Sequence, residues 1–276
     1  MAVDIPYRRE FAFEYGRLEP VAPGIRRIVA RNPGPFTFKG TGTYVVGEGE
    51  VAVIDPGPEL AEHVAALLAS LADESVTHIL VTHTHRDHSP AAKALKEATG
   101  APTYGFGPHA GGKRGEPGIE EGGDWDFAPD IVVRDGDWID GGKWRVEAAH
   151  TPGHTSNHLC FALPDSGILF SGDHVMGWST SVIAPPDGDM AAYMASLDRL
   201  LARGDAVQQA APHRVRAAER GPPSAAVRVQ PRAAAEARNW RTRRAAPRWR
   251  RQSMIGLFCA RFSPQAQRHH RVITRE

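Results

Sequence analysis

The stretch THTHRDHSP (residues 82–90) places three histidines and an aspartate within six positions. Neutral imidazole is the commonest side-chain ligand for zinc, and a carboxylate adds a harder oxygen donor. A catalytic zinc ion takes three protein ligands and keeps one position for water, so this loop alone offers more donors than one ion needs. The stretch therefore indicates a metal site with His83, His85, Asp87 and His88 as candidate ligands.

The sequence on either side predicts that this stretch is a strand-to-helix loop. The apolar run VTHILVTH (76–83) predicts a short strand that leads into the histidines. Ser89 is expected to be an N-cap and Pro90 the first residue of a helix that runs to about residue 99. Because α/β folds carry their chemistry on such loops, the position agrees with a functional site.

Further donors follow other predicted strands. WRVEAAHTPGHTSNH (144–158) predicts a strand and then a loop that carries His154, and a hairpin ends at Asp173. Residues 41–58 predict another hairpin, and residues 59–72 and 189–203 predict helices. The second helix is expected to bury a stripe that includes Met190 and Leu201. Strands that alternate with helices predict a layered α/β fold.

Three of these stretches resemble the metallo-β-lactamase-fold hydrolases, whose hallmark is HxHxDH, then a distant histidine, then an aspartate. They are THTHRDHS, HTPGHTSNH and SGDHV. Within that family, residues 43–57 and 175–201 resemble the branch of β-lactamase-like endoribonucleases and their bacterial relatives. The resemblance covers about residues 20–207. It implies an α/β (α+β) fold, a four-layer αββα sandwich with the metal loops along one edge.

The same resemblance implies which residue holds which ion. His83, His85 and His154 match the ligands of a first metal, Asp87 and His88 match ligands of a second, and Asp173 matches the bridging position. The family completes the second metal with one more histidine in a Pro-x-His-Gly segment. Here His213 follows a proline but lacks the glycine, so whether it replaces that ligand stays open.

The implied activity is that of a zinc-dependent hydrolase. Two zinc ions would share a bridging hydroxide, which Asp87 orients, and the expected substrate is a phosphodiester such as single-stranded RNA. One alternative is a thioester hydrolase similar to glyoxalase II, although Ser89 is followed here by Pro90-Ala91 where glyoxalase-type sequences carry Gly-Gly. The others are a mononuclear iron dioxygenase, a β-lactam hydrolase, and a metal-binding but catalytically impaired product of a frameshifted gene.

Several other residues have two interpretations each. Asp55 either hydrogen-bonds a ligand histidine or caps a turn, and His158 and His174 either support ligands or simply pack. Residues 177–181 are expected to line the substrate cleft. Cys160 is interpreted as an inert core thiol. The remaining histidines are interpreted as structural: His63, His78, His109 and His150.

Composition bounds the class of protein. The chain has 276 residues, of which 41% are hydrophobic and 24% charged, as in ordinary globular proteins. Two cysteines, Cys160 and Cys259, do not make a disulfide framework, so we expect a reducing, cytoplasmic location. No run approaches the roughly 18 apolar residues of a membrane span. We therefore expect no membrane partner; the oligomeric state is left open.

Charge divides the chain into two parts. Residues 1–207 hold 17 basic and 29 acidic residues, a net charge of −12, whereas residues 208–276 hold 16 arginines and three glutamates, a net charge of +13. We expect a metallo-β-lactamase-fold domain over residues 1–207, with its first ~20 residues peripheral. Residues 208–276 are either a disordered basic arm that grips RNA phosphates or a frameshifted translation, and the total lack of lysine favours the frameshift.

Overall fold

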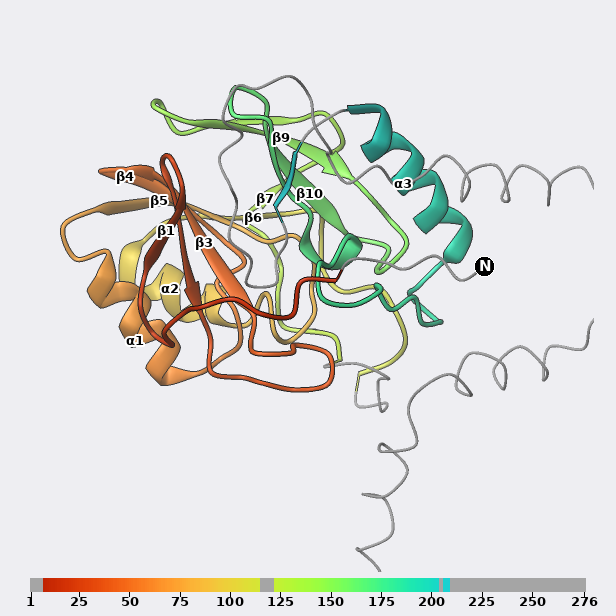
Figure 1. Ribbon diagram of the computed structural model, residues 1–276, viewed down its shortest axis with the longest axis horizontal. Helices are drawn as coiled ribbons and strands as arrows, with labels where there is room; N and C mark the ends of the chain where they lie inside the picture. The colour runs from red at the N-terminus through yellow and green to blue at the C-terminus, as the bar shows by residue number, and fades with distance from the viewer. Residues whose placement is uncertain (1–6, 115–121, 204–205, 209–276) are drawn as a thin grey trace, which may run out of the picture. The chain divides into compact units, whose positions relative to one another are not determined.

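The computed structural model describes residues 7–114, 122–203 and 206–208 (Figure 1). The tail predicted from residue 208 onward lies outside the described residues except for Gln208, and so does the candidate ligand His213. Within the described part, two β-sheets lie between helices.

The first sheet has seven strands in sequential order. It is antiparallel from β1 to β4 and parallel from β4 to β7. The β3–β4 hairpin confirms the hairpin predicted at residues 41–58, and β5 confirms the strand before the histidines. The strands are β1 (Glu19–Ala22), β2 (Ile25–Val29), β3 (Gly42–Glu48), β4 (Glu50–Ile54), β5 (Ser75–Leu80), β6 (Thr103–Gly105) and β7 (Ile131–Val132).

The second sheet has five strands in the order β12-β11-β10-β9-β8. It is antiparallel from β8 to β11, and β12 joins β11 in parallel. The strand expected before His154 is β9, and the hairpin expected before Asp173 is formed by β10 and β11. The strands are β8 (Trp138–Asp140), β9 (Arg145–His150), β10 (Leu159–Leu163), β11 (Ile168–Phe170) and β12 (Ala206–Gln208).

Helices cover both outer faces of this pair of sheets. α1 (Ala61–Ser70) and α2 (Ala91–Thr99) lie on one side, and α3 (Met190–Arg203) lies on the other (Figure 1). A short 3₁₀ turn, η1 (Gly172–His174), follows β11. A bilayer span needs about 20 apolar residues, and no helix in the described part of the chain meets that requirement.

The apolar side chains form a separate core at each of the three interfaces between layers. Along β4, Val51 and Val53 face α1 and α2, while Ala52 and Ile54 face the second sheet. This alternation is the period of two that lets one strand serve two interfaces. A third cluster, which includes Cys160 and Leu200, joins the second sheet to α3. The predicted αββα sandwich is therefore confirmed.

Two local predictions were wrong. Pro90 has the helical conformation expected at the start of α2, but the Ser89 side chain does not cap the helix, because its hydroxyl donates to Asp124 Oδ2 at 2.7 Å. In α3, Met190 and Leu201 are each 48% exposed. The buried residues of α3 are Ser196 and Leu200, so the helix contacts the second sheet through a narrower stripe than predicted.

Candidate metal centre

Three loops bring the predicted donors together at one edge of the sandwich. The first follows β5, the second joins β9 to β10, and the third is η1 after β11. Leu159 N donates to Thr82 O at 2.7 Å, which ties the first loop to the strand after the second. Gly172, with φ +49°, lies so close to the other loops that a Cβ there would come within 2.6 Å of His158 Nε2. Glycine before Asp173 is therefore a packing requirement.

His83, His85 and His154 form one donor set. All three are buried, and each offers a ring nitrogen within 4.8 Å of the others. His154 Nε2 lies 3.1 Å from His85 Nδ1. Two nitrogens bound to one zinc ion at tetrahedral angles are separated by roughly 3.3 Å, because each Zn–N bond is about 2.0–2.1 Å long. The spacing suits one shared cation.

Asp173 lies between this set and a second group of donors. Its Oδ1 is 3.4 Å from His88 Nε2, and its Oδ2 is 3.9 Å from His154 Nε2. Asp87 Oδ2 lies 3.2 Å from His88 Nε2. His83, His88 and Asp173 also form a compact group with donor atoms within 4.8 Å. The six predicted ligand side chains thus occupy one cluster, buried except for the partly exposed Asp173, which directs one oxygen to each half.

Asp55 orients histidines in both halves. Its Oδ2 accepts a hydrogen bond from His88 Nδ1 at 2.9 Å and another from the Thr82 hydroxyl at 2.8 Å. The same hydroxyl lies 3.0 Å from His83 Nδ1, which makes it the acceptor for an Nδ1–H on His83. These bonds turn Nε2 of both rings toward the centre, where that of His88 faces the Asp87 and Asp173 carboxylates. Of the two interpretations of Asp55, the structure supports the hydrogen bond to a ligand histidine.

Burial and donor chemistry fit a divalent cation. His83 Nε2 is buried and has no hydrogen-bond partner among the described residues, although an unpaired buried nitrogen is costly. Burial, and then the neighbouring histidines, hold the pKa of His83 and of His85 well below the ordinary value. His154 Nδ1 contacts Val182 O at 2.7 Å, so its Nε2 also faces the centre. Neutral rings with inward lone pairs are what a metal requires.

At the second group of donors, neighbouring charges outweigh burial in setting the pKa values of His88 and Asp87. Burial lowers the pKa of His88, but the carboxylates of Asp87, Asp173 and Asp55 outweigh it and raise that pKa well above the ordinary value. Burial raises the pKa of Asp87, but His88 and His85 bring it below the usual range. The Asp87 carboxylate is therefore ionised, as a metal ligand must be.

Two residues that support Asp87 were missed in the sequence analysis. The Thr41 hydroxyl donates to Asp87 Oδ2 at 2.8 Å. Asn32 holds Thr41 in turn, because its Nδ2 donates to the Thr41 hydroxyl at 3.1 Å and its Oδ1 accepts from Thr41 N at 2.9 Å. Thr41 is 46 positions from Asp87, and the short TGT run around it carries no pattern that identifies it.

His158 and His174 each had two interpretations, support of a ligand or simple packing. His158 contacts the Thr151 hydroxyl through Nδ1 at 2.9 Å and stacks on His83, with ring centroids 5.1 Å apart. Burial, and then His154, lower the pKa of His174 to about 4; its ring packs on Tyr193. Within the described residues neither ring hydrogen-bonds a candidate ligand, which favours packing. His150 is structural, since it contacts Ser156 O and stacks on Phe106.

Cys160 lies in the core, and the segment 177–181 lies beside the centre. Cys160 is buried, and burial raises the pKa of its thiol to about 12, so the inert core thiol is confirmed. In 177–181, the Ser181 hydroxyl donates to His174 O at 2.9 Å. Trp178 borders a hollow beside the centre, together with Phe36, Met176 and the side chains of Asp87, His88 and Asp173.

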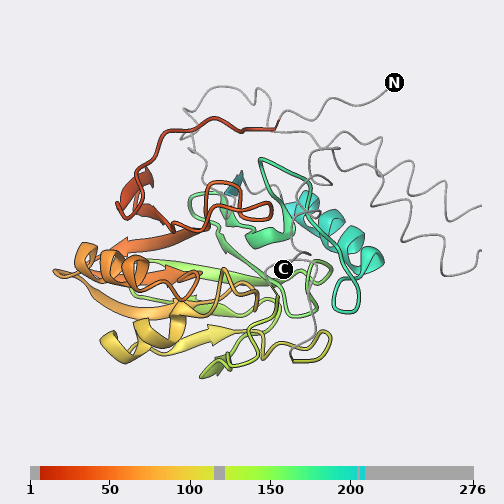
Figure 2. The same cartoon turned by 90° about the horizontal axis from the view of Figure 1, so that it is seen from below.

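The rim around this hollow joins distant segments. The Phe38 and Trp178 rings stack, with centroids 5.0 Å apart, so the loop after β2 meets the segment after η1 (Figure 2). Arg8 N donates to Gly177 O at 2.8 Å, and Arg9 Nε donates to Trp178 O at 3.3 Å. The N-terminal stretch, expected to be peripheral, thus contacts the rim.

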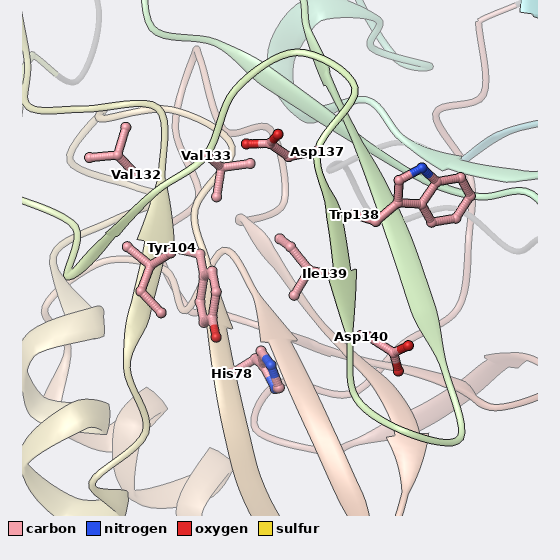
Figure 3. A pocket seen from close by; sticks show the side chains of 9 residues that line it. His78, Tyr104, Val132, Val133, Asp137, Trp138, Ile139 and Asp140 are labelled. Atoms are coloured by element: carbon pink, nitrogen blue, oxygen red, sulfur yellow. The ribbon is translucent and has the colours of Figure 1, made fainter.

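A larger cavity of about 250 Å³ lies elsewhere, between the edge strands β7 and β8 (Figure 3). His78, Tyr104 and Ile139 face one another across it. His78 stacks on Tyr104, and its Nδ1 contacts the hydroxyl of the adjacent Thr77 at 2.8 Å. No metal-ligating group of the described residues includes a residue of this cavity. We therefore assign the chemistry to the smaller hollow beside the histidine loops.

Comparison with known proteins gives the following matches. The sequence model of the metallo-beta-lactamase superfamily matches residues 37–213. The chain is 33% identical over 190 residues to an atrochrysone carboxyl ACP thioesterase of Claviceps purpurea, which covers 67% of this chain and 54% of that protein. The chain spans about half the length of the curated relatives it matches.

Solved structures share the fold. A metallo-beta-lactamase family protein of Thermus thermophilus matches with a TM-score of 0.57 at 24% identity, over 70% of this chain and 75% of that one. A protein solved in a di-iron-bound form matches with a TM-score of 0.51 at 26% identity, over 68% of this chain and 91% of that one. The residues 37–213 that the family model matches include all three loops of the centre.

Proposed function

Because the chain belongs to the metallo-β-lactamase superfamily, we propose that it is a metal-dependent hydrolase that cleaves thioesters. The thioesterase name of the matched relative supports the substrate class, although the chain spans only about half of that protein. The observation that carries the proposal is the buried convergence of ring nitrogens on one point, with His83 Nε2 unpaired there. Hydrolysis of a carbonyl compound is a reaction that such a centre performs when loaded.

Two zinc ions are the cofactors we propose. His83, His85 and His154 would hold the first, Asp87 and His88 would hold the second, and Asp173 would contact both. Nitrogen and carboxylate donors suit zinc and also iron, and one matched structure is described in a di-iron-bound form. Whether His213 replaces the further ligand that the family supplies to the second ion stays open, because His213 lies outside the described residues.

The bound ions would supply a Lewis acid for the thioester carbonyl and a water of lowered pKa. The protein's own residues prepare the site for that chemistry. Asp55 holds the His88 ring directly and the His83 ring through Thr82, with Nε2 of each directed at the centre. The Thr41 bond to Asp87 Oδ2 fixes the carboxylate, so that Asp87 can accept a hydrogen bond from the attacking water and orient it.

The overall reaction is balanced without any further reactant. The oxygen of water forms a bond to the carbonyl carbon, the carbon–sulfur bond breaks, and the sulfur leaves as a thiolate. The protons of that water go to the thiolate and to solvent, which yields a thiol and a carboxylate. No oxidant is required, and this distinguishes the proposal from the iron dioxygenase alternative.

The phosphodiester substrate stays a prediction, because the same pair of cations would neutralise a phosphate. The test compares two probes on the zinc-loaded full chain: benzoyl-coenzyme A as a thioester and bis(p-nitrophenyl) phosphate as a phosphodiester. We expect turnover of the thioester that is lost on chelation and restored by zinc. Turnover of the phosphate alone would replace thioester hydrolysis by the phosphodiesterase prediction. Turnover of neither by a zinc-loaded protein would contradict the proposed function.

A further inference from the structure

An aromatic wall, formed by Phe38 and Trp178, stands beside the centre. The two rings are nearly parallel, with planes 12° apart and centroids 5.0 Å apart. Both residues are only half-buried, so this stack is not part of the sandwich cores. Trp178 also borders the hollow above His88 and Asp173. The wall therefore adjoins, through Trp178, the hollow beside the candidate ligands.

The backbone of Phe38 is strained in order to build this wall. Its φ is +56°, a conformation that is unfavourable for a bulky residue and ordinary for glycine. Gly34 and Phe38 exchange two backbone hydrogen bonds, Phe38 N to Gly34 O at 2.8 Å and Gly34 N to Phe38 O at 3.2 Å, which hold the loop in that shape. Strain that the surrounding structure enforces at the edge of a site is a pointer to a role in that site.

The N-terminal stretch supports the wall from the far side. Phe11 packs on Phe38 with ring centroids 6.2 Å apart, and Arg9 binds the backbone of Trp178. Lys39 Nζ lies 4.5 Å from the centre of the Phe11 ring and 5.7 Å from that of Phe38. Contacts from three segments thus fix two ring planes, and a fixed plane offers an aromatic ligand a stacking partner at little entropic cost.

We propose that the wall selects the substrate class: the site takes thioesters of planar aromatic acyl groups in preference to short alkyl ones. This inference rests on the proposed function for the identity of the reacting bond. A planar acyl group would stack on the wall, and the Met176 thioether beside Trp178 suits contact with an aromatic edge. An acetyl group has no face to stack and would gain nothing from the wall.

The first experiment measures binding without turnover. The zinc-loaded full chain is titrated with two non-hydrolysable thioethers of pantetheine, one 2-naphthylmethyl and one methyl. We expect the naphthyl compound to bind about tenfold more tightly, the upper end of what an aromatic contact contributes. Trp178→Leu and Phe38→Gly should each remove most of that preference.

The choice of variants keeps the result interpretable. Phe38→Gly removes the ring and also suits φ +56°, so loss of preference there does not come from a failure to fold. Trp138→Leu is the matched control, because Trp138 is 51% exposed on β8 beside the other cavity, and it should keep the preference. Equal binding of both thioethers to the wild-type protein, or an unchanged preference in both wall variants, would overturn the inference.

The second experiment separates this inference from the proposed function. The kcat/KM ratio for benzoyl- over acetyl-pantetheine is measured for the same proteins, and it should fall several-fold in both wall variants. If no thioester is cleaved but the naphthyl thioether still binds through the wall, the proposed function fails and the aromatic site remains. If both thioesters are cleaved with a ratio that the wall variants do not change, the function stands and the aromatic preference fails.

Discussion

The metal centre and the cavity between β7 and β8 both contain histidine, but they use it in opposite ways. In the centre, four histidines direct ring nitrogens at one another, and Asp55 and Val182 fix the outward nitrogens. In the cavity, His78 stacks on Tyr104 and contacts its neighbour Thr77. The cavity is the larger hollow, yet only the centre has converging donors. Convergence of oriented donors, not volume, therefore marks the functional site.

The largest effect should come from removing a ligand of the centre. His83→Ala removes the unpaired Nε2. Substituting a residue that only supports a metal ligand already costs up to about 100-fold in activity, so we expect a loss greater than this. His78→Ala at the cavity is the matched control and should keep wild-type turnover. Steady-state kinetics on both zinc-loaded proteins measure the difference. Full turnover by His83→Ala would break the contrast between the two regions.

Asp55→Asn should have the next largest effect, because one carboxylate orients His88 directly and His83 through Thr82. An amide cannot accept from the His88 Nδ1–H and the Thr82 donors as a carboxylate does. We expect zinc affinity to weaken by about 10–100-fold. Competition with a fluorescent chelator measures this, with Asp140→Asn on β8 as the control. Zinc affinity within twofold of wild type in Asp55→Asn would show that the orientation does not depend on Asp55.

These interactions also show how far the sequence predicts the site. The HxHxDH run, His154 and Asp173 could be identified because each sits at the end of a predicted strand, and strand ends meet when the sheets pack. Thr41 could not, because it reaches Asp87 from 46 positions away and only after β3 and β5 join one sheet. Phe38 and Trp178 likewise meet through loops whose shape no local pattern predicts.

The same limit explains the local errors in the fold. Ser89 has the sequence context of an N-cap, but Asp124, from a segment 35 positions away, binds its hydroxyl. The strand at β4 was predicted more securely, because burial on both faces requires apolar residues at successive positions, and residues 51–54 are all apolar. Where a local pattern permits two outcomes, contacts with residues distant in the sequence decide between them.

Thr41→Val should have a moderate effect. It keeps the shape of the side chain but removes the hydrogen bond to the ionised Asp87, a kind of bond worth ~1.5 kcal/mol or more. We expect kcat to fall about tenfold with little change in KM, since Asp87 acts on the attacking water. Thr41→Ser restores the hydroxyl and should restore kcat. A serine variant as slow as the valine variant would mean that packing, not the hydrogen bond, is what Thr41 provides.

Tyr104→Phe should have the smallest effect. Tyr104 lines the cavity, and no ring contact or hydrogen bond joins it to a candidate ligand in the described part of the chain. We expect kcat/KM and zinc affinity within about twofold of wild type, because a half-buried hydroxyl away from the centre contributes at most to stability. A loss of activity greater than about fivefold in a folded protein would move the cavity into the functional site.

The most direct test is the zinc content of the full chain, measured by mass spectrometry after metal-free protein is offered excess zinc and then desalted. We expect two zinc ions per wild-type chain, none or one in His83→Ala, and two in His78→Ala. One ion in the wild-type protein would keep the centre but contradict the paired arrangement. A wild-type protein that is folded and holds no zinc would contradict the account.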